Sequence, residues 1–167
     1  ADAARPALDL AAVLKAQAKQ IGFDLVGICD ARPFVQDRAY LDNRTALGIA
    51  PNPFEPPDLE TRTDPQAVLP GCRSIVAVGM SYVMPDDETP ASQQPTLSGW
   101  FSRYCRGLDY HAVLDERMAR LADWLAGQSP GAGSVIHAEV GARLDRAIAQ
   151  RAGLGRFGKS TNLIARG

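Results

Sequence analysis

A glycine-rich segment followed by a lysine is the first candidate for chemistry. Residues 153–160 read G-L-G-R-F-G-K-S and match G-x-x-x-x-G-K-[ST], a pattern that binds phosphates through backbone N–H groups. That loop works when it leaves a strand and enters a helix, because the helix N-terminus then faces the phosphates. Here a helix is predicted before the loop, and strand-like residues follow it. The reversed order argues against nucleotide hydrolysis, although the glycines still allow the backbone to approach a bulky ligand.

Basic residues gather in the same part of the chain. Residues 143–166 have a local balance of +5, whereas the whole chain has a net charge of −1. The basic cluster consists of Arg143, Arg146, Arg151, Arg156, Lys159 and Arg166. Such a cluster binds phosphates of nucleic acid or of a cofactor, or it forms the solvated face of a helix and of the loop after it. The charge pattern alone leaves both interpretations open.

The cysteines predict neither a disulfide framework nor a metal site. Cys29, Cys72 and Cys105 are scattered singly along the chain. An iron–sulfur cluster needs closely spaced thiolates, as in C-x₂-C-x₂-C, because several of them must converge on one small cluster. We therefore expect free thiols that are buried or incidental, and no metal ligands in this chain.

Alternating helices and strands are predicted to position these residues. Asp9 and Asp109 are candidate N-caps, and Gly22 is a helix stop. Helices are expected at 8–21, 34–43, 109–126 and 142–152. Strands are expected at 23–28, 73–82, 134–137 and 161–165. The apolar run in 73–82 predicts a strand that is buried on both faces.

Prolines and polar residues interrupt this alternation twice. Five prolines in residues 48–66 exclude regular structure over most of that stretch, and Asp64-Pro65 is typical of a capped first turn. Residues 85–99 are polar and rich in turn formers.

Length and composition indicate one globular domain spanning residues 1–167. The chain is 46% apolar and 22% charged, as soluble domains are, and no apolar stretch approaches the roughly 20 residues of a membrane span. The predicted fold class is α/β (α+β), with a layered mixed sheet flanked by helices. We expect a cytoplasmic monomer with no membrane partner.

Read in order, several short segments resemble the N-terminal, cobalamin-binding domain of epoxyqueuosine reductases. The resemblance covers most of the chain from about residue 10, and its most specific part pairs G-x-D-Y-H with R-A-G-L-G-x-x-G-K. The segments are 21–28 (IGFDLVGI), 62–74 (RTDPQAVLPGCRS), 81–82 (SY), 102–111 (SRYCRGLDYH), 144–147 (LDRA) and 151–164 (RAGLGRFGKSTNLI).

The resemblance implies an oxidoreductase of queuosine biosynthesis. Enzymes of this kind hold cobalamin in a wide cleft and reduce epoxyqueuosine at the wobble position of tRNA. Their electrons come from two four-iron four-sulfur clusters in a following ferredoxin-like domain, which this sequence lacks. The chain is therefore expected to be inactive without that domain. A partner tRNA carrying epoxyqueuosine is implied as well.

The same resemblance suggests site residues. Tyr110 and His111 would line the cofactor or substrate pocket, and Arg146 and Lys159 would contact phosphates of the cofactor tail or of tRNA. The loop containing Gly153, Gly155 and Gly158 would approach the corrin closely. Arg156 stands where an aromatic residue is common in the family, and Ser160 where asparagine is common.

His111 is not assigned as a cobalt ligand. Residues 109–114 read DYHAVL, whereas the cobalt-ligating motif of another group of cobalamin proteins is D-x-H-x-x-G. Leu114 replaces the glycine, and a helix rather than a loop is predicted there.

Glu139 is the candidate proton donor by the same resemblance. In the family a carboxylate seven residues before the arginine of the D-R-A segment has this role, and counting back from Arg146 gives Glu139. Aspartate is usual there, so the carboxyl of Glu139 is one methylene longer. A free glutamate has a pKa of about 4.3, and burial beside an uncharged corrin would raise it. Alternatively, Glu139 is an end-of-strand residue that pairs with Arg143.

Two other functions stay open at this point. The chain could carry or deliver cobalamin without catalysis, which would equally explain the missing cluster ligands. It could also be a remnant that binds only tRNA or a partner protein.

Overall fold

The computed structural model describes residues 9–49, 58–83, 101–105, 107–138 and 143–165. Its elements occur in the order α1 (Leu10–Ile21), β1 (Leu25–Asp30), α2 (Val35–Ala46), α3 (Leu59–Thr63), η1 (Pro65–Ala67), β2 (Ser74–Gly79), η3 (Arg103–Cys105), α4 (Tyr110–Gln128), α5 (Asp145–Arg151), β3 (Gly155–Phe157) and β4 (Leu163–Ala165).

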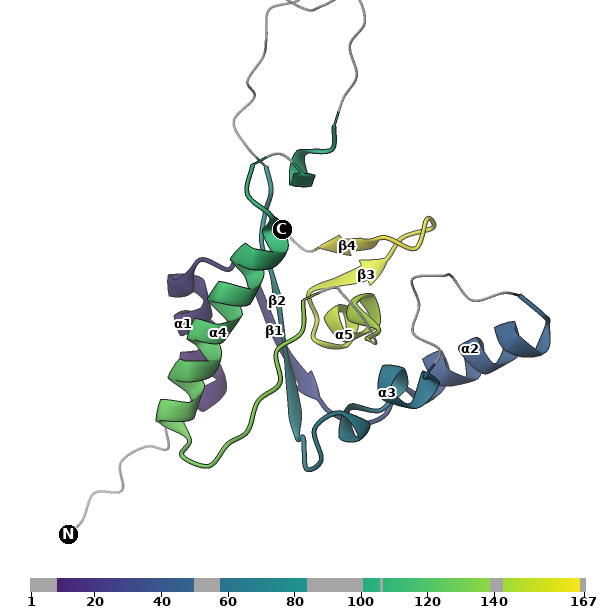
Figure 1. Ribbon diagram of the computed structural model, residues 1–167, viewed down its shortest axis with the longest axis horizontal. Helices are drawn as coiled ribbons and strands as arrows, with labels where there is room; N and C mark the ends of the chain where they lie inside the picture. Colours follow the sequence, from purple (N-terminus) through teal and green to yellow (C-terminus); the bar gives the residue numbers. More distant parts are fainter. Residues whose placement is uncertain (1–8, 50–57, 84–100, 106, 139–142, 166–167) are drawn as a thin grey trace, which may run out of the picture.

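An antiparallel pair of strands, β1 and β2, lies between two helical layers (Figure 1). Val26 on β1 pairs with Val78 on β2, and both pack toward α1 and α4. The next residue of β1, Gly27, faces the end of α5 instead. Because successive side chains of a strand point to opposite faces, this alternation places α1 and α4 on one face of the sheet and α5 on the other.

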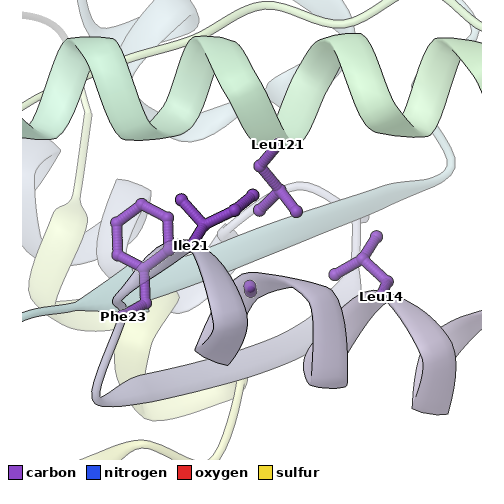
Figure 2. Packing of buried hydrophobic residues seen from close by; sticks show 5 residues of the cluster. Leu14, Ile21, Phe23 and Leu121 are labelled. Carbon is purple, nitrogen blue, oxygen red and sulfur yellow. The ribbon is translucent and has the colours of Figure 1, made fainter.

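The core lies between α1, α4 and the sheet. Figure 2 shows Leu14 and Ile21 of α1 and Phe23, just before β1, directed toward Leu121 of α4, and all four residues are at most 7% exposed. Burying each such side chain contributes about 1.5–3 kcal/mol. The core therefore fixes α4, whose first turn carries two of the predicted site residues.

Local signals in the sequence set the ends of α1. The Asp9 carboxylate accepts hydrogen bonds from the backbone N–H groups of Ala11 and Ala12, which would otherwise lack partners. Gly22 ends the helix in the left-handed conformation with φ 111°, as helix C-termini often require.

A second antiparallel pair, β3 and β4, follows α5 and forms a hairpin. Its turn contains Lys159 and Ser160, since the Thr161 N–H donates to the Gly158 carbonyl and the Gly158 N–H donates to the Asn162 carbonyl. The segment that resembles a phosphate-binding loop is thus a helix end followed by a hairpin. A helix therefore precedes the segment and a strand follows it, as predicted.

Most predicted elements are confirmed, with shifted bounds. Helices form at each predicted place, strands form at three of the four, and Asp64 caps the short η1 helix as expected. The α+β class is confirmed for the described residues, and helices cover both faces of the central strand pair. The prediction of one mixed sheet is wrong for these residues, because the strands form two separate pairs and both pairs are antiparallel.

Two further expectations need correction, those for residues 134–137 and for β2, and two elements, α3 and β3, were not predicted. Residues 134–137 are not a strand, because nothing pairs with them among the described residues. The helix α3 forms in the proline-rich stretch because its own five residues contain no proline and Asp58 caps it. The strand β2 is half-buried rather than buried on both faces, since only part of its second face is covered. Residues 85–99 lie outside the described part.

Among the described residues, no helix is both long and apolar enough to cross a bilayer.

Candidate functional site

The first turn of α4 presents Tyr110 and His111 beside an aspartate. Asp109 caps the helix by accepting from the His111 backbone N–H at 2.9 Å, and its Oδ1 also lies 2.9 Å from Nδ1 of the His111 ring. Because a carboxylate only accepts hydrogen bonds, Nδ1 carries the proton in this contact. The ring and the backbone of His111 together hold the pKa of Asp109 below its usual value.

An open pocket of about 380 Å³ lies at this helix end, and Tyr110 and His111 both line it. Their rings are stacked, with centroids 4.0 Å apart and an angle of 29° between the planes. Leu108, which is 83% exposed, adds an apolar wall. The pocket is thus flat-walled and largely apolar, with one carboxylate at its edge.

Arg146 of α5 contacts the β3–β4 hairpin. Its Nη1 donates to the Thr161 carbonyl at 2.8 Å and to the Thr161 hydroxyl at 3.0 Å. Thr161 has φ 65°, in the left-handed region that β-branched residues avoid. One guanidinium nitrogen of Arg146 is therefore engaged in holding the turn that presents Lys159.

Backbone conformation and close contacts within the chain explain why glycines stand at several positions of this loop. Gly153 has φ 80°, which a residue with a side chain adopts only with strain. A Cβ on Gly155 would lie 2.4 Å from the Ile164 carbonyl oxygen, so the approach of β4 requires a glycine there. A Cβ on Gly158 would lie 3.1 Å from the Ile164 side chain, a tight contact. In this chain Gly155 and Gly158 shape the hairpin, and Gly153 shapes the link between α5 and β3.

The basic cluster divides into engaged and exposed members. Arg151 stacks 3.4 Å above the centre of the buried Phe34 ring and lies 3.6 Å from the Asp30 carboxylate. Arg143 donates to the Thr61 carbonyl at 3.2 Å. Arg156 and Lys159, by contrast, are exposed on the hairpin. Arg166 lies outside the described residues.

Glu139, the predicted proton donor, also lies outside the described residues, as do residues 139–142 in general. Just before them, the Nε2 atom of His137 is buried and has no hydrogen-bond partner in the described part of the chain.

The structure thus gathers the predicted residues into two groups. Tyr110 and His111 line the pocket, whereas Arg146, Lys159 and the three glycines belong to α5 and the hairpin. Sequence reasoning missed Tyr104, which lines the pocket and contacts Tyr110 edge-on at 5.8 Å between ring centroids. The sequence signal for Tyr104 is its place in the segment SRYCRGLDYH, which also contains Tyr110, and both tyrosines line the pocket.

All three thiols are free, as predicted, with Cys29 and Cys72 half-buried and Cys105 exposed at the pocket. Burial raises the pKa of Cys29, and the nearby Arg151 partly offsets this effect. Within the described ranges no group of three or more His, Cys, Asp or Glu residues could hold a metal ion.

Comparison with known proteins identifies the relatives. The family described as "Epoxyqueuosine reductase QueG, DUF1730" matches residues 62–140. The epoxyqueuosine reductase of Bacillus cereus is 36% identical over 149 residues, which are 89% of this chain and 39% of that protein.

Solved structures agree over nearly the whole chain. An epoxyqueuosine reductase bound to an epoxyqueuosine-modified tRNA-Tyr stem loop superposes with a TM-score of 0.83 at 33% identity, covering 93% of this chain and 41% of the other. The Bacillus subtilis enzyme, with an aspartate catalytic loop swung out of its active site, gives 0.82 at 33% identity and the same coverage. This chain belongs to the epoxyqueuosine reductase family, and it spans about two-fifths of the length of these relatives.

Proposed function

We propose that this chain is the cobalamin-binding and tRNA-binding part of an enzyme that reduces epoxyqueuosine to queuosine in tRNA. The observation that carries the proposal is the superposition, over 93% of the chain, on a relative crystallised with an epoxyqueuosine-modified stem loop. Residues 1–167 would form one domain of that enzyme. A cytoplasmic location, where tRNA is found, and a monomeric state are further parts of the same proposal.

The pocket fits part of a corrin. Its stacked Tyr110 and His111 rings and the Leu108 side chain offer flat, apolar contacts of the kind that cofactor sites use. Its volume of about 380 Å³ is too small for a whole cobalamin, so the remaining cofactor surface would need other walls. The hairpin with Gly153, Gly155 and Gly158 is our candidate for the second wall, and Arg146 would fix its turn.

Lys159 is the candidate for the phosphate contact. It is exposed at the turn of the hairpin, and an ammonium group there can approach a phosphate of the cofactor tail or of tRNA without breaking an internal bond shown by the structure. Arg146 would act on the same phosphate mainly by holding the Thr161 backbone in place.

The reaction sets the chemical demands on the chain. Removing the epoxide oxygen to leave an alkene consumes two electrons and two protons and releases water. Bound cobalamin would supply the electrons to the epoxide carbon. The chain must therefore exclude water around the substrate and deliver a proton to the departing oxygen.

Glu139 is the proposed source of that proton. It lies seven residues before Arg146, and relatives in this family include one with an aspartate on a catalytic loop. A glutamic acid is protonated near neutral pH only where burial or a like charge raises its pKa. We infer that the closed complex with cofactor and RNA provides this burial.

Electrons would come from outside this chain. Its cysteines are single, and the described part has no cluster of metal ligands. We propose that iron–sulfur clusters belong to the part of the enzyme that the two-fifths match leaves uncovered. The same observation favours a second candidate function, a cobalamin-binding or carrier module without catalysis.

A cobalamin titration tests the cofactor claim. Hydroxocobalamin mixed with the protein and passed through a gel-filtration column should leave corrin absorbance with the protein peak. Tyr110→Ala and His111→Ala should each reduce the retained absorbance, whereas Tyr40→Ala, an exposed tyrosine on α2, should not. Corrin that elutes wholly with small molecules at tens of micromolar protein would refute binding, and iron in stoichiometric amount would refute our interpretation of the cysteines.

A further inference from the structure

Three tyrosines and a histidine from separate segments form one exposed aromatic cluster, which consists of Tyr82, Tyr104, Tyr110 and His111. Tyr82 follows β2, Tyr104 lies in η3, and the other two begin α4. The ring centroids of Tyr82 and Tyr104 are 6.3 Å apart at 71°, and those of Tyr104 and Tyr110 are 5.8 Å apart at 85°. Figure 1 shows the end of β2 and the start of α4 at the same end of the molecule.

Two tyrosines of the cluster are open to solvent. Tyr82 is 61% exposed and Tyr104 is 48% exposed, so the hydrophobic core does not account for their position. Edge-to-face contacts instead hold each ring against its neighbour, in the geometry that aromatic pairs prefer. The rings are thus oriented in advance, and much of their area stays available to a ligand.

The adjoining pocket suits a flat ligand of one or two rings. Tyr104 and Tyr110 line it together with Gly107, whose φ of 98° turns the chain between them. About 380 Å³ accommodates a nucleobase with its sugar and is too small for an entire corrin with its side chains. The Asp109 carboxylate at the edge can accept from an exocyclic amino group or a ring N–H.

We propose that Tyr104, with Tyr82 beside it, is a stacking platform for an unpaired nucleobase of the RNA substrate, next to the Tyr110 and His111 rings that would contact the corrin. The inference rests on the proposed function, which supplies an RNA with an unpaired loop. Proteins recognise such loops by splaying bases out and stacking them on aromatic side chains. Every base has a π-face, so the platform contributes affinity with little dependence on sequence.

Fluorescence anisotropy with a labelled anticodon stem loop tests the platform. Tyr104→Ala should weaken binding by about 5- to 100-fold, the usual effect of removing one stacking ring. Tyr104→Phe should bind as the wild type does, because the ring remains. Tyr40→Ala is the matched control, since Tyr40 is 66% exposed on α2 and belongs to no cluster that the structure shows. Melting curves check that each variant folds.

A modified RNA makes the test specific for a base. Loop nucleotides are replaced one at a time by abasic sites, and binding to the wild-type protein is measured for each RNA. At one position the abasic site should lower the affinity as much as Tyr104→Ala lowers it for the intact RNA. On that RNA the Tyr104→Ala change should cost nothing further. The slope of affinity against salt should be the same for wild type and Tyr104→Ala, because stacking releases no counterions.

An independent readout uses Cys105, an exposed thiol that lines the same pocket. Its alkylation, followed by peptide mass spectrometry, should slow when the stem loop is bound and recover with the abasic RNA.

Three results would overturn the platform. In the first, Tyr104→Ala binds RNA as tightly as Tyr40→Ala does. If the wild type still binds and reduces the substrate, the platform alone fails and the proposed function is retained. In the second, Tyr104→Ala loses hydroxocobalamin but keeps RNA, which gives the cluster to the cofactor. In the third, the wild type binds no stem loop, and the proposed function fails together with the platform.

Discussion

Arg146 and Thr161 are joined by two hydrogen bonds from a single guanidinium nitrogen, one to the Thr161 carbonyl and one to its hydroxyl. The partner is a β-branched residue at φ 65°, a conformation that costs roughly 1–2 kcal/mol for residues other than glycine. The hydroxyl contact helps to offset that strain. Because Lys159 lies in the same turn, this pair links the predicted phosphate-binding residues through the backbone.

Substitutions of Thr161 should separate the strain from the hydrogen bond. Thr161→Val keeps the branched side chain but removes the acceptor, and it should lower the free energy of unfolding by about 1 kcal/mol. Thr161→Asn offers a side-chain oxygen and tolerates the left-handed region, so it should raise that free energy slightly. Urea denaturation midpoints measure both. Equal midpoints for the two variants would show that the turn does not depend on this contact.

Gly27 on β1 should tolerate no side chain. A Cβ there would lie 2.4 Å from the Ala152 carbonyl oxygen and 2.9 Å from the Leu154 side chain, so Gly27→Ala should destabilise the protein by about 1–3 kcal/mol. Gly127→Ala is the control, because Gly127 lies in α4 with nothing within 4 Å of its missing Cβ. Thermal melting should show a loss for the first variant and no loss for the second. The reverse order would mean that α5 does not pack against β1 as described.

The exposed members of the basic cluster should contact RNA phosphates, and the engaged members should not. Arg156→Ala and Lys159→Ala should each reduce the slope of log affinity against log salt by about 0.9 on duplex RNA, or about 0.7 on single strands. Arg151→Ala should leave the slope unchanged and lower thermal stability, since it removes the contacts with Phe34 and Asp30. Filter binding at several salt concentrations measures these slopes. A changed slope for Arg151→Ala, with unchanged slopes for Arg156→Ala and Lys159→Ala, would contradict this division.

Sequence patterns predicted the parts of the fold whose signals are local. The caps Asp9, Asp64 and Asp109 and the stop at Gly22 act within a few residues, and the helices begin and end near them. The strand expected at 134–137 failed because pairing depends on a distant partner that no local pattern specifies. The half-buried state of β2 has the same cause, since coverage of its second face depends on where α5 packs.

The candidate site shows the same limit. Tyr110 and His111 were predicted from a recognisable motif, and the structure places both at one pocket. Tyr82 could not be assigned to the aromatic cluster, because 21 residues lie between it and Tyr104 and only the folded chain joins them. The engagement of Arg151 with Phe34 was equally hidden, since 117 positions separate the two residues.

The proposed acid, Glu139, should matter for turnover and hardly at all for binding. Glu139→Gln keeps the size of the side chain but removes the transferable proton, so it should lower the rate by about 10²–10⁴, the usual contribution of general acid catalysis. Glu139→Asp should retain substantial activity because it keeps the carboxyl. Rates are compared by single turnover of bound RNA, with cobalamin and RNA affinities measured in parallel. A Gln variant with nearly normal turnover would leave a bound water as the proton source.

The proposed function requires this chain to bring cobalamin and epoxyqueuosine RNA together for reduction. The direct measurement incubates the protein with cobalamin, an epoxyqueuosine stem loop and a low-potential chemical reductant such as titanium(III) citrate, and then analyses the nucleosides by mass spectrometry. A product lighter by one oxygen atom should form slowly, and only when protein, cobalamin and reductant are all present. Absence of that product although both ligands are bound, or equal formation without the protein, would contradict the account.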